Sequence, residues 1–274
     1  MSLRILYWNV WCLPFFATDG VHSKDRAEAI APILRGYDVV ILNEAWTDAA
    51  KKVFKREYTY SYQTSKMCGK LLDSGLLILS NHLIHNPSHI LYSDAAGWDW
   101  FTSKGALHFQ IRTTSDISIR RLQDKKKYKR WSKPKILKTY DIFTTHMQAG
   151  YSTKDHDARR IQLRELTRFV NSKTRFVNSK LPGAENVFLI GDFNVMPMLG
   201  DAPYPNCHDI IDARRRSLEY HKIHNQTGLV DLNLHNIQDV YHVFSNSDPD
   251  RVDITYHDST LADGPYLTID VTIA

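Results

Sequence analysis

Eight short apolar runs, rich in β-forming residues, are the feature of this sequence that most constrains its fold. They span residues 3–11, 37–46, 74–81, 105–112, 136–147, 186–195, 251–257 and 266–274. Helical patterns separate only some of these runs, so a simple array of alternating parallel strands and helices does not account for the strand-dense stretch between 74 and 147. The pattern predicts an α/β protein in which two mixed β-sheets pack face to face with helices outside.

Three segments carry the apolar spacing of helices, namely residues 23–36, 47–57 and 156–180. We expect Ser23 to cap the first helix and Gly36 to end it. In the third segment the sequence "TRFVNSK" at 167–173 is repeated at once at 174–180. Seven residues are close to two helical turns, so the second copy drifts by only ~20° from the face of the first. We interpret the repeat as a lengthened helix.

The composition indicates a soluble globular protein. Hydrophobic residues make up 43% of the 274 residues and charged residues 24%, and no apolar run is long enough to cross a bilayer. Strand-like sequence begins at Leu3, so we expect no signal peptide; the compartment stays open, and peripheral membrane association is compatible with the composition. Three widely spaced cysteines, Cys12, Cys68 and Cys207, predict neither a disulfide framework nor a zinc cluster.

A basic segment at 119–138 lies between two predicted strands and has the position of a hairpin insertion. It is rich in lysine and arginine and contains Tyr128 and Trp131. Together with the formal net charge of +5, it favours an anionic partner such as a phosphate ester, a nucleic acid or an acidic membrane surface. Two interpretations remain open, a solvated loop and a docking element that inserts Trp131 at a membrane interface.

Polar residues stand at the carboxyl ends of four predicted strands. Asn9 follows "ILYW", Glu44 follows "VVILN", His146 follows "DIFTT", and Asp192 and Asn194 follow "VFLIG". Each one alone has an ordinary structural explanation, such as a capping amide, but the repeated placement indicates that they surround one cleft. Carboxylate and amide oxygens suit Mg²⁺, with Mn²⁺ as an alternative, and such a site suits metal-assisted cleavage of a phosphodiester.

At this point the sequence resembles a known family. "GDFN" after an apolar strand, "TH" at the end of the preceding strand and a glutamate ending the second strand are the ordered signature of the endonuclease/exonuclease/phosphatase, or deoxyribonuclease-I-like, superfamily. The segments "NVWCLPFF", "DSGLLILSNHLI", "GWDWFTSKGALHF" and "THMQAGY" look most like the neutral sphingomyelinases. The likeness covers nearly the whole chain and implies a single domain, 1–274, with a four-layer α/β/β/α sandwich fold.

The resemblance implies a role for each strand-end residue. Glu44 would be the principal Mg²⁺ ligand, with Asn9 beside it. His146 and Asn194 would hold the phosphoryl oxygens, and Asp192 would orient the attacking water.

The resemblance also covers the end of the chain, where the sequence departs from the family pattern. Asp253 matches the aspartate that braces a catalytic histidine, and Asp263 matches the aspartate of a closing Ser-Asp-His motif. The histidine of that motif is replaced by Gly264, which has no side chain to accept a proton. Loss of a general base costs roughly 10²–10⁴-fold in rate. His257, seven residues upstream of Gly264, is a candidate substitute.

A tryptophan-rich stretch followed by Lys-Gly favours the phospholipase-C-type branch of the superfamily over the nuclease branch. It implies substrate binding by Lys104 and by Trp98, Trp100 and Phe101. With the phenylalanines at 15–16, these aromatic residues would either pack internally or form a rim that enters the headgroup region of a membrane.

Three functions follow from these interpretations. The first is a Mg²⁺-dependent phosphodiesterase of the sphingomyelinase type that acts on a sphingolipid or phospholipid at a membrane surface. The second is a lipid- or phosphate-binding relative that has lost turnover with the missing histidine. The third, a nuclease favoured by the basic segment, ranks below both, so nucleic acid is the less expected partner. We expect a monomer.

Overall fold

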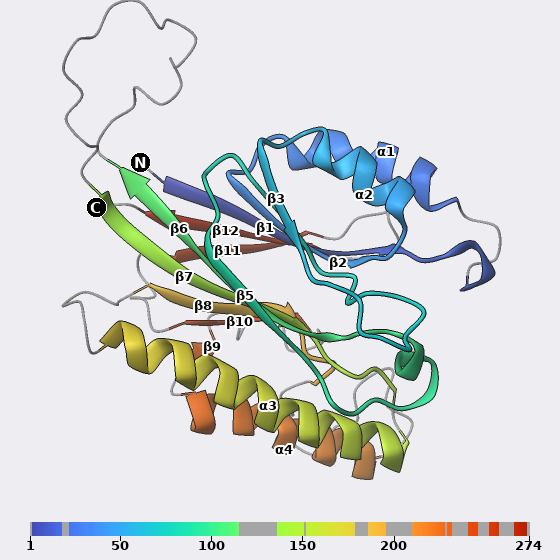
Figure 1. The fold of residues 1–274 in the computed structure, drawn as a ribbon. Coiled ribbons are helices and arrows are strands. Elements are labelled where there is room, and N and C mark those ends of the chain that lie inside the picture. Colours follow the sequence, from blue (N-terminus) through green and yellow to red (C-terminus); the bar gives the residue numbers. More distant parts are fainter. Residues whose placement is uncertain are drawn as a thin grey trace, which may run out of the picture.

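The computed structural model describes residues 2–17, 22–114, 136–150, 152–178, 186–195, 210–227, 229–231, 241–245, 252–257 and 266–272. Within these residues, two six-stranded β-sheets pack face to face, and helices cover the outer side of each sheet (Figure 1). The predicted α/β/β/α sandwich is confirmed.

The first sheet has the strand order β11, β12, β1, β2, β4, β3. Its strands are β1 (Ser2–Cys12), β2 (Val39–Ala45), β3 (Tyr60–Gln63), β4 (Leu77–Ser80), β11 (Val252–His257) and β12 (Tyr266–Thr272). Helices α1 (Ser23–Leu34) and α2 (Asp48–Lys55) cover its outer face, where Ile30 and Phe54 pack against Leu6 and Val40.

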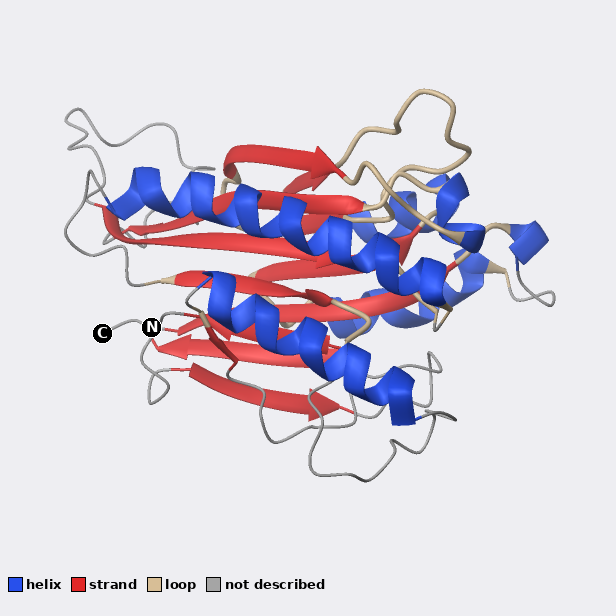
Figure 2. Cartoon of the chain, turned by 90° about the horizontal axis from the view of Figure 1, so that it is seen from below, coloured by secondary structure: helices blue, strands red, loops and turns tan. Residues whose placement is uncertain are grey.

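The second sheet has the strand order β5, β6, β7, β8, β10, β9. Its strands are β5 (His85–Leu91), β6 (Gly105–Thr114), β7 (Ile136–His146), β8 (Val187–Asp192), β9 (Val230–Asp231) and β10 (Tyr241–Ser245). Helices α3 (Thr153–Asn178) and α4 (Ile210–Thr227) lie over its outer face, as Figure 2 shows from below. Two short 3₁₀ helices, η1 (Phe15–Ala17) and η2 (Gly97–Phe101), lie in the loops.

The core between the sheets explains the continuous apolar runs. In β1, Ile5 and Tyr7 point into the space between the sheets, where they meet Phe109 and Ile142 of the second sheet. The residues that alternate with them, such as Leu6, point outward under the helices. Because both faces of β1 are covered, its central residues from Ile5 to Trp8 are all apolar and buried instead of alternating with polar residues.

The central strands of each sheet form a parallel pair, β1 with β2 and β7 with β8. The helices α1 and α3 lie in the crossovers between the members of these pairs, as a parallel connection requires. Parallel strands end at the same edge of a sheet, so each pair places two carboxyl ends side by side.

Most of the predicted elements are found. Each of the eight predicted strands corresponds to an observed one, whereas β3, β5, β9, β10 and α4 were not predicted. The prediction that Ser23 caps α1 is wrong, because His22 is at the cap position and the Ser23 hydroxyl donates to the Leu13 carbonyl instead. Helix α3 runs into the second copy of the repeat, and Phe169 of the first copy is buried in the core.

The basic segment lies largely outside the described residues. The strands before and after it, β6 and β7, are antiparallel neighbours paired as far as Thr114 and Ile136, which agrees with its position as a hairpin connection. The single-domain and monomer interpretations stay predictions. In the part of the chain that the structure describes, no helix is long and apolar enough to cross a membrane.

Gly191 allows a close approach of the central strands β7 and β8. A Cβ atom at this position would lie 2.4 Å from the main-chain oxygen of Thr145, so one strand would have to move. We expect Gly191→Ala to lower the free energy of unfolding by about 1–3 kcal/mol, measured by urea denaturation. The control is Gly36→Ala, whose Cβ would meet only the Arg4 side chain at 3.7 Å and should change stability by less than about 0.5 kcal/mol. Equal effects of the two changes would contradict this account.

Candidate active site

The carboxyl ends of the two parallel pairs meet at one edge of the sandwich. In the first sheet Asn9 is in register with Asn43, the residue before Glu44. In the second sheet His146 is in register with Asp192. The structure therefore brings together the strand-end residues that the sequence predicted, two from each sheet.

The side chain of Asn9 bridges the carboxylates of the two sheets. Its Nδ2 donates to Glu44 Oε1 at 3.0 Å and to Asp192 Oδ2 at 3.2 Å. Its Oδ1 accepts from the Trp11 amide at 3.2 Å, so the nitrogen of the amide faces the carboxylates. One neutral group thus holds two acidic groups from different sheets within reach of a common ligand.

Two of these residues have an unusual backbone conformation. Glu44 has a φ of 57° and Asn194 a φ of 52°, in the left-handed region that residues other than glycine rarely occupy. The Asn194 amide donates to Asp192 Oδ1 at 3.1 Å, and its Nδ2 donates to the Met147 carbonyl at 3.0 Å. Backbone strain of this kind occurs frequently at functional sites, where the surrounding structure maintains it.

Burial makes both carboxylates poor acids. Removal from water raises the pKa of Asp192 to about 7; the Lys104 ammonium opposes this shift, and the nearby Glu44 carboxylate adds to it. Burial also raises the pKa of Glu44, against the hydrogen bond from Asn9. Negative charge on this pair is therefore costly unless a cation is close.

The same pair is where a metal ion would fit. Among the described residues, no group of three or more His, Cys, Asp or Glu side chains forms a metal site. Mg²⁺ does not need such a group, because it binds through one or two carboxylates and keeps several waters. The carboxylate oxygens of Glu44 and Asp192 suit that mode of binding, and a cation would offset the charge that burial disfavours. Asn9 would contribute its Oδ1 only if its amide turned that oxygen toward the ion, since its Nδ2 now faces the carboxylates.

His146 is a buried neutral imidazole. Its Nε2 lies 3.0 Å from Lys104 Nζ, and because an ammonium can only donate, Nε2 is the acceptor and the ring proton is on Nδ1. Burial, followed by the charge of Lys104, holds the pKa of His146 well below its usual range. Nδ1 has no hydrogen-bond partner among the residues that the structure describes. The Trp46 ring lies 6.5 Å from the imidazole, centroid to centroid.

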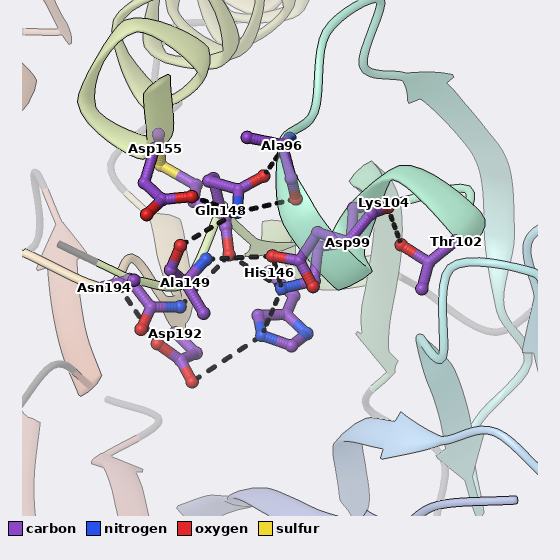
Figure 3. Close-up of polar contacts among 12 residues, drawn as sticks. Ala96, Asp99, Thr102, Lys104, His146, Gln148, Ala149, Asp155, Asp192 and Asn194 are labelled. Atoms are coloured by element: carbon purple, nitrogen blue, oxygen red, sulfur yellow. Dashed lines mark hydrogen bonds and ion pairs between the residues drawn. The ribbon is translucent and has the colours of Figure 1, made fainter. Parts of the chain in front are cut away.

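Lys104 connects His146 to the aromatic loop (Figure 3). Its Nζ donates to Asp99 Oδ2 at 2.8 Å and to the Met147 carbonyl at 3.0 Å, in addition to His146. Asp99 belongs to η2, and its Oδ2 also accepts from the Ala149 amide at 2.9 Å. The loop with the exposed tryptophans is thus attached to the polar site through one carboxylate.

A pocket of about 760 Å³ opens above this site. Its polar lining includes Glu44, Lys104 and His146, whereas Phe16 and Trp98 belong to its apolar lining. The aromatic side chains around it are strongly exposed, with 85% of Trp98 and 73% of Phe16 accessible to solvent. Its other lining residues are Trp11, Leu13, Pro14, Ala17, Trp46, Leu71, Leu72, Asp99, Phe101, Thr102 and Ala149.

Asp253, which was predicted from the end of the sequence, is placed away from this site by its strand register. In the register of the first sheet Asp253 lies opposite Asp270, which lies opposite Arg4 of β1. Arg4 precedes Asn9 by five residues, a distance of roughly 17 Å along an extended strand. The bracing role of Asp253 stays a prediction that this register does not favour.

His257 lies closer to the site edge, opposite Tyr266, which pairs with Trp8 next to Asn9. Asp263 and Gly264 lie outside the described residues.

Comparison with known proteins agrees with this geometry. The model of the "Endonuclease/Exonuclease/phosphatase family" matches residues 6–271. The chain belongs to this family.

Similar proteins include several sphingomyelinases. A sphingomyelinase of Dictyostelium discoideum is 26% identical over 209 residues, which are 64% of this chain and 41% of the relative, so the match spans about two fifths of that protein. Sphingomyelinase C from Streptomyces griseocarneus has a similar fold, with a TM-score of 0.66, 17% identity and coverage of 99% of this chain and 100% of that one. Beta toxin from Staphylococcus aureus, solved with bound magnesium ions, gives a TM-score of 0.65 at 16% identity and covers 99% of this chain and 100% of its own.

Sequence reasoning missed two residues of this family member's site. Asp99 was not singled out, although a carboxylate inside the aromatic run "GWDWF" is a signal that could have identified it. Trp46 follows Glu44 by two residues and was given no role, and the structure places it in the pocket beside His146. The contact of Asp99 with Ala149 and that of Trp46 with His146 both join segments that are far apart in the chain.

The raised pKa of Asp192 predicts a pH-dependent penalty in the metal-free protein. A carboxylate whose pKa is higher in the folded state stabilises the fold below its unfolded pKa, and this stability is lost as the pH rises through the folded value of about 7. In EDTA, we expect Asp192→Asn to be more stable than the parent, with an advantage that grows from about pH 4 to 7 and then levels off. At pH 8 the gain should be at least about 1.4 kcal/mol, the equivalent of one pKa unit.

Urea denaturation across this pH range measures the difference. Asp157→Asn is the control, because that side chain is 58% exposed and its neutralisation should not alter the pH profile. A pH-independent difference between Asp192→Asn and the parent would contradict the buried-charge account.

Proposed function

We propose that this chain is a Mg²⁺-dependent phosphodiesterase that hydrolyses the headgroup phosphodiester of a sphingolipid or phospholipid, with sphingomyelin as the first candidate substrate. The observation that carries the proposal is the pocket, in which an acidic and basic floor lies directly beside an exposed aromatic rim. A lipid phosphodiester has the same two-part chemistry. The sphingomyelinases among the similar proteins support this substrate class, and the magnesium ions in beta toxin support the choice of metal.

Each polar residue has a task in this reaction. Glu44 and Asn9 would hold Mg²⁺, which neutralises charge on the non-bridging phosphoryl oxygens when bound. Asp192, whose Oδ2 lies 3.9 Å from His146 Nε2, would orient the attacking water. Water adds to phosphorus in line with the lipid oxygen, the bond to that oxygen breaks, and the proton from water ends on the released alcohol.

The donors that face growing phosphoryl charge are held in advance. Lys104 is kept in place by Asp99 and by the Met147 carbonyl, so its ammonium does not need to reorganise during the reaction. His146 is neutral, and its Nε2 accepts from Lys104, so the imidazole helps to hold the ammonium without adding a buried charge. The amide of Asn194 supplies a further donor at the same edge.

We expect the protein to hydrolyse sphingomyelin in mixed micelles with Mg²⁺ and to lose this activity in EDTA. Release of phosphocholine measures turnover, and Glu44→Gln should reduce kcat by about 10²-fold or more, because it removes the charge that would bind the metal. Lysophospholipid and inositol-phosphosphingolipid micelles test the neighbouring headgroups. Nicking of plasmid DNA serves as the comparison substrate; strong, steeply salt-dependent nicking without lipid hydrolysis would replace the proposal with a nuclease.

The replacement of the family's histidine by Gly264 supplies the second candidate, a relative that binds lipid without turnover. If the parent protein is inactive and Gly264→His gains roughly 10²–10⁴-fold, the chain is such a relative. An active parent excludes this alternative.

We also propose that the aromatic rim attaches the protein to the lipid surface. The rim consists of the exposed side chains of Trp98, Trp100, Phe101, Phe15 and Phe16. Tryptophan is favoured at the interface between headgroups and acyl chains. The rim borders the pocket, so insertion would place the pocket mouth at the depth of the phosphodiester.

The rim predicts a loss of membrane binding when it is truncated. We expect Trp98→Ala to weaken binding to sphingomyelin/phosphatidylcholine vesicles about ten-fold, the equivalent of losing 1.4 kcal/mol of apolar burial, in a vesicle sedimentation assay. Leu83→Ala is the matched control, since Leu83 is a 50% exposed apolar side chain outside the pocket lining. Equal weakening by both changes would argue against docking through the rim.

A further inference from the structure

The main chain of residues 147–150, here named the site turn, joins several residues of the proposed site. The Met147 carbonyl accepts from Lys104 Nζ and from Asn194 Nδ2, both at 3.0 Å. An amide of the same turn donates to the carboxylate of Asp99 at 2.9 Å. A displacement of the turn would therefore displace three site residues together, in addition to the adjoining His146.

Arg159 of helix α3 holds the site turn from the opposite side. Its Nη1 donates to the Gln148 carbonyl at 2.7 Å and to the Gly150 carbonyl at 2.9 Å. The side chain is completely buried, with 0% of its surface exposed, and it does not belong to the pocket lining. Arg159 thus contacts only the support of the site and has no access to a substrate in the pocket.

Arg159 is itself fixed by a carboxylate from another helix. Its Nε donates to Glu219 Oε2 of α4 at 2.9 Å, and its Nη2 lies 3.0 Å from His156 Nδ1. Glu219 is 7% exposed, so the two opposite charges are paired away from water. Lysine could not replace Arg159 here, because a single ammonium lacks the planar guanidinium geometry that allows contact with two carbonyls and a carboxylate together.

The site turn needs an external support. Gly150 has a φ of 93°, and a Cβ atom there would lie 2.5 Å from Asp155 Oδ2. The Gln148 side chain, in turn, donates to the Asp155 carboxylate at 3.2 Å and to the Ala96 carbonyl at 3.2 Å (Figure 3). The two carbonyl groups that accept from Arg159 Nη1 belong to this turn, so the arginine is one of the groups that fix its position.

We propose that Arg159 is a positioning residue for this site, and that the Arg159–Glu219 pair fixes the site turn and, through it, Lys104, Asn194 and His146. The kinetic part of this inference rests on the proposed phosphodiesterase function. A residue that acts through geometry alone lowers kcat more than it raises KM. Displacements on the scale of 1 Å at a reacting centre cost about 10²-fold in rate.

The variants are chosen to separate positioning from folding. Arg159→Ala removes the support, and the double variant Arg159→Ala/Glu219→Gln also neutralises the carboxylate that would otherwise be left buried without its partner. Arg160→Ala is the matched control on the same helix, because that side chain is 53% exposed and pairs only with Asp157 at 3.1 Å among the contacts of the described residues. Circular dichroism and thermal melts establish that each variant is folded at the assay temperature.

Two readouts are measured on these proteins. Hydrolysis of sphingomyelin with Mg²⁺ gives kcat and KM, with and without millimolar guanidinium chloride, and urea at the same concentration is the solvent control. A surface hollow of about 240 Å³ is lined in part by His156 and Glu219, the two side chains that contact Arg159, so we expect guanidinium to reach the vacated position from there. The ¹H–¹³C NMR signal of the His146 ring reports changes in the surroundings of this side chain without requiring activity. It is assigned as the signal that is absent from the His146→Gln variant.

We expect Arg159→Ala, alone or with Glu219→Gln, to lower kcat about 10²-fold with KM within three-fold. Guanidinium should raise the kcat of these variants at least ten-fold, whereas urea should not raise it. The chemical shifts of the His146 ring should differ from those of the parent. Arg160→Ala should match the parent in all of these measurements. A folded Arg159→Ala protein with parental kcat, or a loss that guanidinium does not rescue and that leaves the His146 signal unchanged, overturns the proposal. If the parent hydrolyses no phosphodiester, the proposed function fails, and the His146 signal alone decides the positioning role.

Discussion

The buried amide of Asn43 joins the two sheets directly beneath the site. Its Nδ2 donates to the Tyr7 hydroxyl of the first sheet at 2.8 Å and to the Thr145 carbonyl of the second at 3.0 Å. Apolar packing holds two sheets together without choosing one sliding position over another, whereas a hydrogen bond to a particular carbonyl does choose. Thr145 precedes His146 and Asn43 precedes Glu44, so this contact sets the imidazole opposite the carboxylate. The arrangement of the site depends on it.

Above this contact, the chemistry of the site follows from how its charges are distributed. One ammonium, that of Lys104, lies among the two buried carboxylates, the imidazole and Asp99. In a medium of low polarity, the charge of one group changes the pKa values of the groups beside it. Burial, followed by the charge of Lys104, keeps His146 neutral, and burial favours the protonated forms of Glu44 and Asp192. A binding site for a doubly charged cation has this property, because such a cation would balance the charge of the two buried carboxylates when both are ionised.

Much of the fold and part of the site could be predicted from the sequence because both rest on local patterns. A polar residue that ends an apolar strand is readable along the chain, and parallel pairing then brings such ends together. The short edge strands β3 and β9 and the polar helix α4 lacked a strong apolar period. The register of β11 is not readable at all, because pairing partners are set by the whole sheet, and this register moves Asp253 along the strand away from the site.

The residues that escaped prediction are those that hold the site in place. Arg159 and Glu219 are charged side chains in segments where charge is ordinary, and only their burial and their partners distinguish them. The left-handed backbone of Glu44 is equally invisible in sequence, whereas Asn194 is of a residue type that adopts this conformation more often than most. Each such conformation costs about 1–3 kcal/mol, which the packed sandwich must supply. These turns take the chain out of the sheet directly at the strand ends, so side chains from both sheets can face one pocket. Prediction from local sequence patterns therefore fails at this edge, because the site needs side chains in positions that a regular strand end would not give them.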